Sequence, residues 1–379
     1  MERGQPTSAG GGPATPRTAR LINDRAAYDL LLARGPLTRT QLRTLTGLSR
    51  PTVADLIDRL TADGLIGVVG EAGAERRGPN ASLYGVVADR AHVAGIEVRA
   101  DTVTAVRADV TGRAVGRAEL PLDPDAAPDT QVLAALDAAG DPAPAAVVIG
   151  TPGLVDPATG DVSYVAALPS WHNNLLAGLR DRLDAPIVVD NEVNLAGLAE
   201  HRLGAARGRD TFALLSIGQG LGVAVVLNGQ LLRGASGGAG EIGYIPYAAA
   251  GSGPTNLQVL AGGAAILALA RAHGATADTL LPAVTEVAGD PDFLDAVADR
   301  IAVAAIGLCA VLDPGFLVLA GSIGHLAGTP LATRVATRLA DAVPLPTEVR
   351  AGTVPTDPVV RGAVLTALDL LHHNTFPTP

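Results

Sequence analysis

The sequence predicts an α/β protein with a small helical domain at its N-terminus and a two-lobed α/β body behind it. Residues 36–66 contain two short helices separated by a glycine turn. Residues 92–118 and 211–234 both follow one plan, in which three strands are joined by tight turns. These two segments begin about 120 residues apart, and each precedes alternating helices and strands, which is typical of a duplicated α/β fold.

The N-terminal segment is predicted to begin with a disordered tail. Residues 1–19 are rich in Gly, Pro, Thr and Ser and hold few apolar residues, so they cannot bury enough surface to fold. The stretch LINDRAAYDLLLAR at 21–34 has apolar residues at helical spacing and predicts a first helix. Residues 20–88 as a whole are predicted to form one domain.

The second predicted helix covers residues 38–46. Thr38 can cap it, because Gln41 stands three residues further on and completes a capping box. Gly47 follows as a signal that ends the helix.

The third predicted helix covers residues 49–63. Ser49 can cap it, and Pro51 is tolerated in the first turn, where no backbone N–H is needed. Apolar residues at spacings of three and four are expected to face a core, namely Val53, Leu56, Ile57 and Leu60. The polar residues are left for the outside, among them Arg50, Thr52, Asp55 and Arg59.

Two strands, at 65–71 and 81–87, are predicted to flank a loop that has Arg76 and Arg77 at its tip. Three helices and a basic hairpin make a winged helix-turn-helix, a motif that places its last helix in the DNA major groove. The alternative to a DNA-binding motif is an ordinary helical hairpin. The alternative for the two loop arginines is a pair of solvated charges without a DNA contact. The residues predicted to contact DNA are Arg39, Thr40, Ser49, Arg50, Thr52, Arg59, Arg76 and Arg77.

The charge distribution fits a DNA partner although the net charge is −10. Residues 1–88 hold 11 Arg against 8 Asp and Glu, whereas the remainder holds 17 Arg against 30 Asp and Glu. A mildly basic domain on an acidic body is typical of a small DNA-binding unit, here with double-stranded operator DNA as the expected partner. The small positive excess indicates that tight binding needs two copies, as a homodimer or a dimer of dimers.

Composition excludes several other classes of protein. No apolar run reaches the roughly 18 residues that a membrane helix needs. The N-terminus lacks the apolar segment of a secretory signal, so a cytoplasmic location is expected. Cys309 is the only cysteine, which excludes internal disulfides and a multi-cysteine zinc site and, in its apolar helical run, predicts a buried thiol.

The body is predicted to divide into a first lobe of residues 89–205 and 359–379 and a second lobe of residues 206–358. A cleft between two such lobes is the natural ligand site. The last residues, NTFPTP, are expected to be loose. The remaining elements of the body are expected as helices near 256–273, 276–288 and 291–312, a strand at 316–321 and a C-terminal helix at 358–372.

Five stretches of the body carry a family resemblance: VIGTPGLVDPATGDV (148–162), LPSWHNNLLAGL (168–179), IVVDNEVNLAGLAEHRLGAARG (187–208), LLSIGQGLGVAVVLNGQLLRGASGGAGEIGY (214–244) and LDPGFLVLAGSI (312–323). Their order and spacing resemble the ROK family (repressors, open reading frames and sugar kinases) over about 280 residues. With a winged helix in front, the chain resembles the regulator branch, typified by repressors of xylose and N-acetylglucosamine genes. The resemblance implies an actin-like ATPase or sugar-kinase-like body of the ribonuclease H-like fold.

The resemblance also implies that two glycine turns would surround the ATP phosphates in a family kinase. The first, Asp-x-Gly-Gly-Thr in those kinases, corresponds to residues 97–101, Glu-Val-Arg-Ala-Asp, and both glycines are gone. The second keeps Gly218, Gly220 and Gly222. Because the first turn is altered, we interpret the second as a vestigial nucleotide site, kept as a tight turn that needs glycine for backbone reasons.

The catalytic base of family kinases is the Asp of an Asn-Asp pair, and here Asn191 is followed by Glu192. The extra methylene moves the carboxylate and spoils proton abstraction. Glu241 keeps its family position, Tyr244 replaces a His and Gln258 aligns with a Glu. The residues predicted to bind an effector are Gly153, Asn191, Glu192, Glu241, Tyr244 and Gln258. A sugar or sugar derivative is the expected effector; another small molecule and an empty site are the alternatives.

The zinc motif CxCGxxGC of the family is absent after residue 244, so no metal and no cofactor are expected. These features predict a DNA-binding transcriptional regulator, most simply a repressor, whose sugar-kinase-like domain has no catalytic residues. One alternative is an ATP-dependent sugar kinase with an accessory DNA-binding domain. The other is an architectural protein that responds to no ligand.

Overall fold

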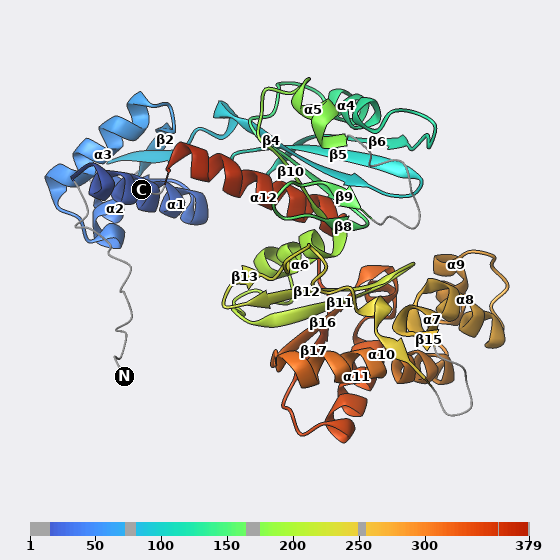
Figure 1. Ribbon diagram of the computed structural model, residues 1–379. Coiled ribbons are helices and arrows are strands. Elements are labelled where there is room, and N and C mark those ends of the chain that lie inside the picture. Colours follow the sequence, from blue (N-terminus) through green and yellow to red (C-terminus); the bar gives the residue numbers. More distant parts are fainter. Residues whose placement is uncertain (1–15, 73–80, 164–174, 249–254, 355, 378–379) are drawn as a thin grey trace, which may run out of the picture.

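The computed structural model describes residues 16–72, 81–163, 175–248, 255–354 and 356–377. These residues form an N-terminal domain and two lobes, and each lobe contains a five-stranded sheet (Figure 1). The C-terminal helix α12 (Pro358–Thr375) runs along the first lobe and ends at the N-terminal domain. No helix among the described residues is long and apolar enough to cross a membrane.

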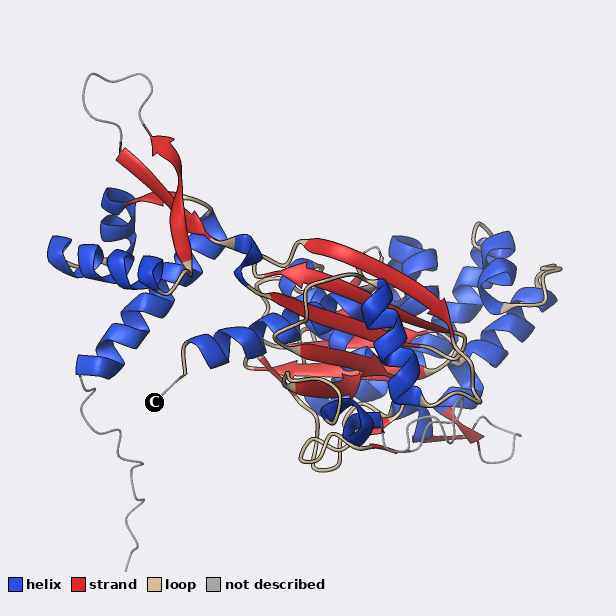
Figure 2. Cartoon of the chain, turned by 90° about the horizontal axis from the view of Figure 1, so that it is seen from above, coloured by secondary structure: helices blue, strands red, loops and turns tan. Residues whose placement is uncertain are grey.

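The N-terminal domain is the predicted winged helix-turn-helix. Its elements are α1 (Pro16–Arg34), β1 (Leu37–Thr38), α2 (Arg39–Thr46), α3 (Arg50–Ala62), β2 (Ile66–Ala72) and β3 (Ala81–Val86). The strands form a sheet of order β1-β3-β2, and the β2–β3 hairpin projects from the helices (Figure 2). One boundary was wrong: α1 begins at Pro16, inside the tail predicted at 1–19, and residues 1–15 lie outside the described residues.

Side-chain caps fix the starts of α2 and α3 as the sequence predicts. Thr38 Oγ1 accepts a hydrogen bond from the Gln41 N–H at 3.2 Å, and Gln41 Oε1 accepts one from the Thr38 N–H at 2.8 Å, so the capping box is complete. Gly47 ends α2 with a φ of 70°, a conformation that strains other residues. Ser49 Oγ accepts from the Thr52 N–H at 3.3 Å and starts α3.

The first lobe is a sheet of order β10-β7-β4-β5-β6 between two layers of helices. Helices α4 and α5 pack on one face of this sheet, and α6 and α12 pack on the other. The elements other than α12 are η1 (Ala88–Arg90), β4 (His92–Val98), β5 (Thr102–Asp109), β6 (Ala114–Pro121), α4 (Pro128–Ala138), β7 (Val147–Thr151), β8 (Leu154–Val155), β9 (Val162–Ser163), α5 (Leu175–Arg180), β10 (Ile187–Asn191) and α6 (Glu192–Leu203).

The second lobe repeats this sheet with the order β13-β12-β11-β16-β17. In both lobes the central strand pairs antiparallel on one side and parallel on the other. The predicted duplication is therefore present. The elements are β11 (Phe212–Ile217), β12 (Leu221–Leu227), β13 (Gln230–Leu231), η2 (Ile242–Tyr244), β14 (Pro246–Tyr247), β15 (Thr255–Asn256), α7 (Leu257–Ala261), α8 (Gly263–Ala272), α9 (Leu280–Val287), α10 (Pro291–Leu312), β16 (Phe316–Ala320), α11 (Gly321–Ala342) and β17 (Glu348–Ala351).

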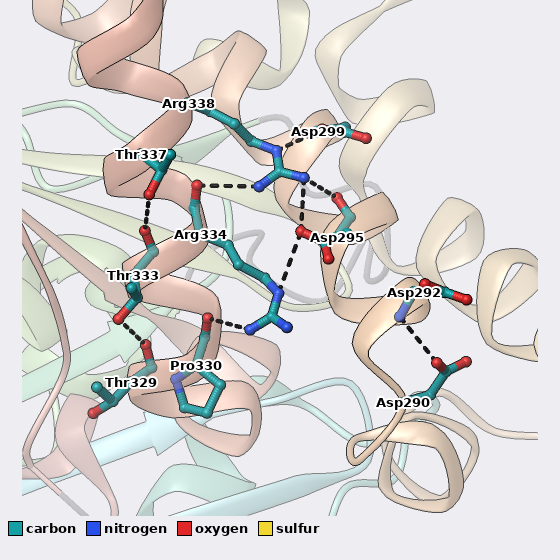
Figure 3. Close-up of polar contacts among 10 residues, drawn as sticks. All are labelled: Asp290, Asp292, Asp295, Asp299, Thr329, Pro330, Thr333, Arg334, Thr337 and Arg338. Atoms are coloured by element: carbon teal, nitrogen blue, oxygen red, sulfur yellow. Dashed lines mark hydrogen bonds and ion pairs between the residues drawn. The ribbon is translucent and has the colours of Figure 1, made fainter.

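Helices α10 and α11 of the second lobe are joined by ion pairs as well as by apolar packing (Figure 3). Arg338 lies within 2.9 Å of Asp295 and also contacts Asp299, and Arg334 lies 3.3 Å from Asp295. These side chains are partly exposed, so each pair adds little stability by itself. Cys309 of α10 is fully buried, as the sequence predicts.

Helix α6 lies between the two lobes. Leu195 belongs to the first-lobe core, whereas Val193 packs on the second-lobe sheet. A Cβ atom on Gly197 would lie 2.5 Å from the Cβ of Ala224 in β12, so glycine permits this close approach.

The predicted loose C-terminus was wrong. Helix α12 continues to Thr375, and Phe376 is 4% exposed within the core of the N-terminal domain. Its ring lies 5.5 Å from the Tyr28 ring of α1, and the His372 ring lies 5.2 Å from the same tyrosine. The C-terminal end of α12 therefore packs on the N-terminal domain, because the apolar side chain of Phe376 is buried there.

Candidate functional site

Helix α3 turns one face to the core of the N-terminal domain and leaves its N-terminus open. The four predicted core residues are buried: Val53, Leu56, Ile57 and Leu60. Ser49 and Arg50 are exposed at the start of this helix, and Thr52 is half-buried. Arg50 has no hydrogen bond or ion pair with any other residue that the structure describes, so its guanidinium is available to a ligand.

The start of α2 lies beside α3 and adds to the same face. Thr40 is exposed. Arg39 Nε donates a hydrogen bond to the Tyr84 hydroxyl at 3.0 Å, and Arg39 Nη2 lies 3.8 Å from Asp58 of α3. Because the Arg39 side chain remains 53% exposed, these contacts orient the guanidinium without covering it. Arg43, which sequence reasoning omitted, is also exposed on α2.

Arg59 does not lie on the open face, contrary to the prediction. Its Nη2 and Nε atoms donate to the two carboxylate oxygens of Asp24 in α1, at 2.6 and 3.1 Å. Asp24 is 8% exposed, so this two-pronged ion pair joins α3 to α1. The hydrogen bond to Asp24 is the main cause of the raised pKa of Arg59. The predicted wing residues Arg76 and Arg77 lie outside the described residues.

The segment 97–101, which was predicted to correspond to the first phosphate turn of family kinases, contains an ion pair. Glu97, the penultimate residue of strand β4, is buried, and Arg99 Nε lies 2.8 Å from its Oε1. Burial raises the pKa of Glu97, and Arg99 opposes this rise. The guanidinium of Arg99 is thus held against Glu97 within the segment 97–101.

Glu192, the first residue of α6, shares its surroundings with three other charged groups. Its pKa is raised to about 7, chiefly by burial; charge repulsion from Glu97 and Glu241 also raises this pKa, and Arg99 lowers it. Burial also raises the pKa of Glu241, which precedes η2 in the second lobe. The structure therefore brings together carboxyl groups from both lobes with one arginine.

Two predicted effector residues serve the backbone instead. Asn191 caps α6, since its Oδ1 accepts from the Val193 N–H at 2.8 Å, and its Nδ2 donates to the Gly153 carbonyl at 3.0 Å. Gln258 Oε1 accepts from the Leu221 N–H at 2.9 Å, and its Nε2 donates to the Gln219 carbonyl at 3.0 Å. Each polar group of these two side chains thus has a backbone partner.

The second glycine turn is shaped by Gln258 rather than by unusual backbone angles. None of Gly218, Gly220 and Gly222 has a left-handed φ, contrary to the backbone requirement that we expected. A Cβ on Gly222 would lie 3.1 Å from Val193 of α6, whereas one on Gly220 would meet no atom within 4 Å. Tyr244 is exposed beside this region.

A contact between the lobes that sequence reasoning missed involves Asp190 and Arg233. Asp190 is the penultimate residue of β10 in the first lobe, and Arg233 Nη2 of the second lobe lies 2.7 Å from its Oδ2. Both residues line a cavity of about 400 Å³ that extends along residues 155–160 and Arg180. The sequence held no signal for this pair, because its partners are 43 residues apart and belong to different lobes. No group of residues suited to hold a metal occurs in the described part of the chain.

Comparison with known proteins places this geometry in a family. A family model described as "ROK family" matches residues 95–369, and one described as "Winged helix-turn-helix DNA-binding" matches residues 20–66. The crystal structure of a ROK family transcriptional regulator, a homolog of the Escherichia coli MLC protein, matches with a TM-score of 0.76 and 20% identity, over 95% of this chain and 98% of that one.

Curated relatives include both enzymes and regulators. The bifunctional enzyme NanE/NanK of Brucella melitensis biotype 1 is 39% identical over 150 residues, which are 38% of this chain and 28% of the enzyme. The DNA-binding transcriptional dual regulator NagC of Escherichia coli (strain K12) is 26% identical over 233 residues, 59% of this chain and 57% of the regulator. This chain thus spans less than two thirds of each of these relatives. Because the ROK model covers well over half of the chain, the protein belongs to the ROK family.

Proposed function

We propose that this protein is a DNA-binding transcriptional regulator, most simply a repressor, whose operator affinity is controlled by a sugar or sugar derivative. The observation that carries the proposal is the exposed Arg50 at the start of α3, whose side chain has no partner among the described residues. The Glu97–Arg99 ion pair, in the segment that corresponds by resemblance to the first phosphate turn of family kinases, supports it. An exposed recognition helix together with an altered nucleotide-binding turn fits a ligand-responsive regulator better than a sugar kinase. Such a protein works in the cytoplasm, where its operator lies.

The proposed DNA interface consists of the start of α3 together with α2 and the hairpin. In a helix-turn-helix, the N-terminal residues of the second helix reach base edges, and flanking groups hold phosphates. We therefore assign base contacts to Arg50 and Thr52 and phosphate contacts to the flanking residues Arg39, Thr40, Ser49, Arg76 and Arg77. Arg59 is left out, because its guanidinium is held by Asp24. We propose that two copies bind one operator, as a homodimer or a dimer of dimers.

The proposed effector site consists of Glu192 and Glu241, one from each lobe, with Tyr244 at its exposed edge. A buried carboxyl group needs a hydrogen-bonding partner, and sugar hydroxyl groups supply both donors and acceptors. Asn191 and Gln258 keep the backbone around the site in place, and Gly153 is the partner of Asn191. A ligand that touches both lobes binds a closed form more tightly than an open one, which is what a switch requires.

Operator binding tests the first part of the proposal. Bound fragments are first selected from genomic DNA with the purified protein, and gel-shift titration then gives their affinity. Replacing Arg50 by Ala is expected to cost about 1–3 kcal/mol, which is roughly 5- to 150-fold in affinity. Arg182→Ala, which removes the same charge from the first lobe, is the matched control and should bind like wild type.

Two results of that experiment would reject the regulator. One is the absence of any selected fragment, and the other is an unchanged affinity of a folded Arg50→Ala variant. Repeating the titration with a panel of sugars is expected to identify at least one that changes the affinity, whereas no response to any of them would favour the architectural alternative.

An ATP-dependent sugar kinase is the second candidate, and the retained turn at Gly218, Gly220 and Gly222 is the observation that favours it. Family kinases, however, have glycines where Arg99 now lies, and Glu192 replaces their catalytic Asp. We expect a coupled assay with ATP and a sugar panel to show no turnover above background. Rates of about 1–100 s⁻¹, which are usual for kinases, would establish the enzyme instead.

A further inference from the structure

The chain crosses between the two lobes twice, and both crossings pass the same carboxyl group. The first crossing follows α6 and leads to β11 at Phe212, and the second follows β17 and leads to α12 at Pro358. Glu200, in the last turn of α6, is fully buried between them. Carboxylates in this position face the negative end of the helix dipole, so the helix itself gives no reason for one here.

Each oxygen of Glu200 holds one crossing. Oε2 accepts a hydrogen bond from the Ala205 N–H at 2.7 Å, and Oε1 accepts one from the Val354 N–H at 2.8 Å. Glycines on both crossings make room for the carboxylate. A Cβ on Gly204 would lie 2.0 Å from Oε2, and one on Gly352 would lie 2.8 Å from Oε1.

The second lobe reaches the same carboxylate through a third element. His325 of α11 has its Nε2 atom 3.7 Å from Glu200 Oε1, while its Nδ1 is 2.9 Å from the Gly321 carbonyl oxygen. Burial opposes ionisation of Glu200, but His325 and the N–H groups of Val354 and Ala205 outweigh it and lower its pKa. The group is therefore a carboxylate at neutral pH.

We propose that Glu200 is the hinge point of the two lobes, a positioning residue that fixes their relative angle by holding both crossings at once. Any rotation of one lobe on the other must turn the chain at these two crossings, because no other covalent path joins the lobes. Glu200 holds both of them within three residues of the ends of α6 and β17. Since α12 begins four residues after Val354 and is followed by Phe376 in the core of the DNA-binding domain, the hinge angle is passed along α12 to that domain.

Replacing Glu200 by Gln tests the hinge, because an amide offers one carbonyl oxygen and can hold only one of the two crossings. Interlobe distances are measured by pulsed electron paramagnetic resonance on spin labels at Asp125→Cys and Asp341→Cys, which are exposed positions in the first and second lobes. Cys309 is buried and stays unlabelled. We expect the distance distribution of the Glu200→Gln variant to be broader than that of the same labelled protein with Glu200, or shifted from it.

Hydrogen exchange gives a second measurement on the same variant. A hydrogen bond to a charged group contributes about 1.5–3 kcal/mol, so the amide that loses its acceptor should exchange about 10- to 150-fold faster. Glu286→Gln is the matched control: Glu286 also accepts from a backbone N–H, that of Thr276 at 2.6 Å, but within one lobe. It should leave the interlobe distance and the exchange of Ala205 and Val354 unchanged.

A folded Glu200→Gln variant whose distance distribution and exchange rates both match wild type would overturn the proposal. If that variant does not fold, the wild-type protein decides. A single hinge requires the amides of Ala205 and Val354 to open together with one free energy, so protection factors that agree support the hinge. Protection factors that differ by more than about tenfold, which is 1.4 kcal/mol, overturn it.

Discussion

Individual carboxyl groups determine the charge of the proposed effector site between the lobes. Glu192 lies near two other carboxyl groups, Glu97 and Glu241, and one arginine, Arg99, so its surroundings carry more negative than positive groups. Burial of this excess raises each carboxyl pKa. A protonated carboxyl can donate a hydrogen bond, and an ionised one can only accept. The site can therefore offer both functions to a polyhydroxyl ligand near neutral pH.

Glu192→Gln is expected to stabilise the protein at alkaline pH. Because folding raises the pKa of Glu192 from 4.5 to about 7, the folded state holds the proton more tightly than the unfolded chain. The stability that this proton provides is fully present below the unfolded pKa and is lost as the pH rises through the folded one. Between these two pKa values the free energy of unfolding decreases by up to about 3 kcal/mol in the wild type. The Glu192→Gln variant shows no such decrease, because glutamine does not titrate.

Urea unfolding of wild type and Glu192→Gln at about pH 5 and about pH 8 measures this difference. The variant should gain stability relative to wild type as the pH rises. A difference that stays constant with pH would show that Glu192 does not titrate in this range.

Errors at the residue scale have one physical cause. Sequence spacing shows which side of a helix is apolar, but it does not show which distant group a polar side chain meets. Arg59 was assigned to DNA because it is polar, although its place at the edge of the buried face leaves it next to Asp24, 35 residues earlier. Gln258 was assigned to a ligand, although the backbone at Gln219 and Leu221 uses both of its polar groups.

Helix ends and strands were predictable at the scale of elements, because their signals are local. The capping box of Thr38 and Gln41 and the cap at Ser49 fixed α2 and α3 to within a residue. Helix α12 was not predictable at its C-terminal end. Its last turns cover α1, and that neighbour is more than 300 residues away in the sequence.

Phe376→Ala is expected to loosen the contact between α12 and α1. Removing a buried phenylalanine ring costs about 3–5 kcal/mol, and here the cost falls on the domain that receives the ring. We expect faster hydrogen exchange in residues 21–34 of α1, with the two lobes unchanged. Phe376→Leu, which keeps most of the apolar volume, is the control and should show a much smaller effect. Unchanged exchange in α1 would mean that the end of α12 does not stabilise the domain.

The whole molecule consists of two lobes of the same fold and an N-terminal winged helix-turn-helix domain. The two sheets share one topology, α6 lies between them, and α12 connects the second crossing with the DNA-binding domain. Glu192, in the proposed effector site, lies in the first turn of α6, and the proposed hinge at Glu200 lies in its last turn. One helix therefore links the ligand site to the hinge, and a second helix links the hinge to α3 by way of α1.

The sequence alone determined the caps of α2 and α3, the duplication and the family, since these depend on local caps, on periodic apolar residues and on motifs at fixed spacing. It also located the open N-terminus of α3 and the altered phosphate turn. The tertiary structure alone decided which polar side chains are already occupied, how Asp190 meets Arg233, and where both crossings meet Glu200. These contacts join residues that are distant in the chain, and no local pattern records them, because the energy of a polar group depends on the partner that folding brings to it.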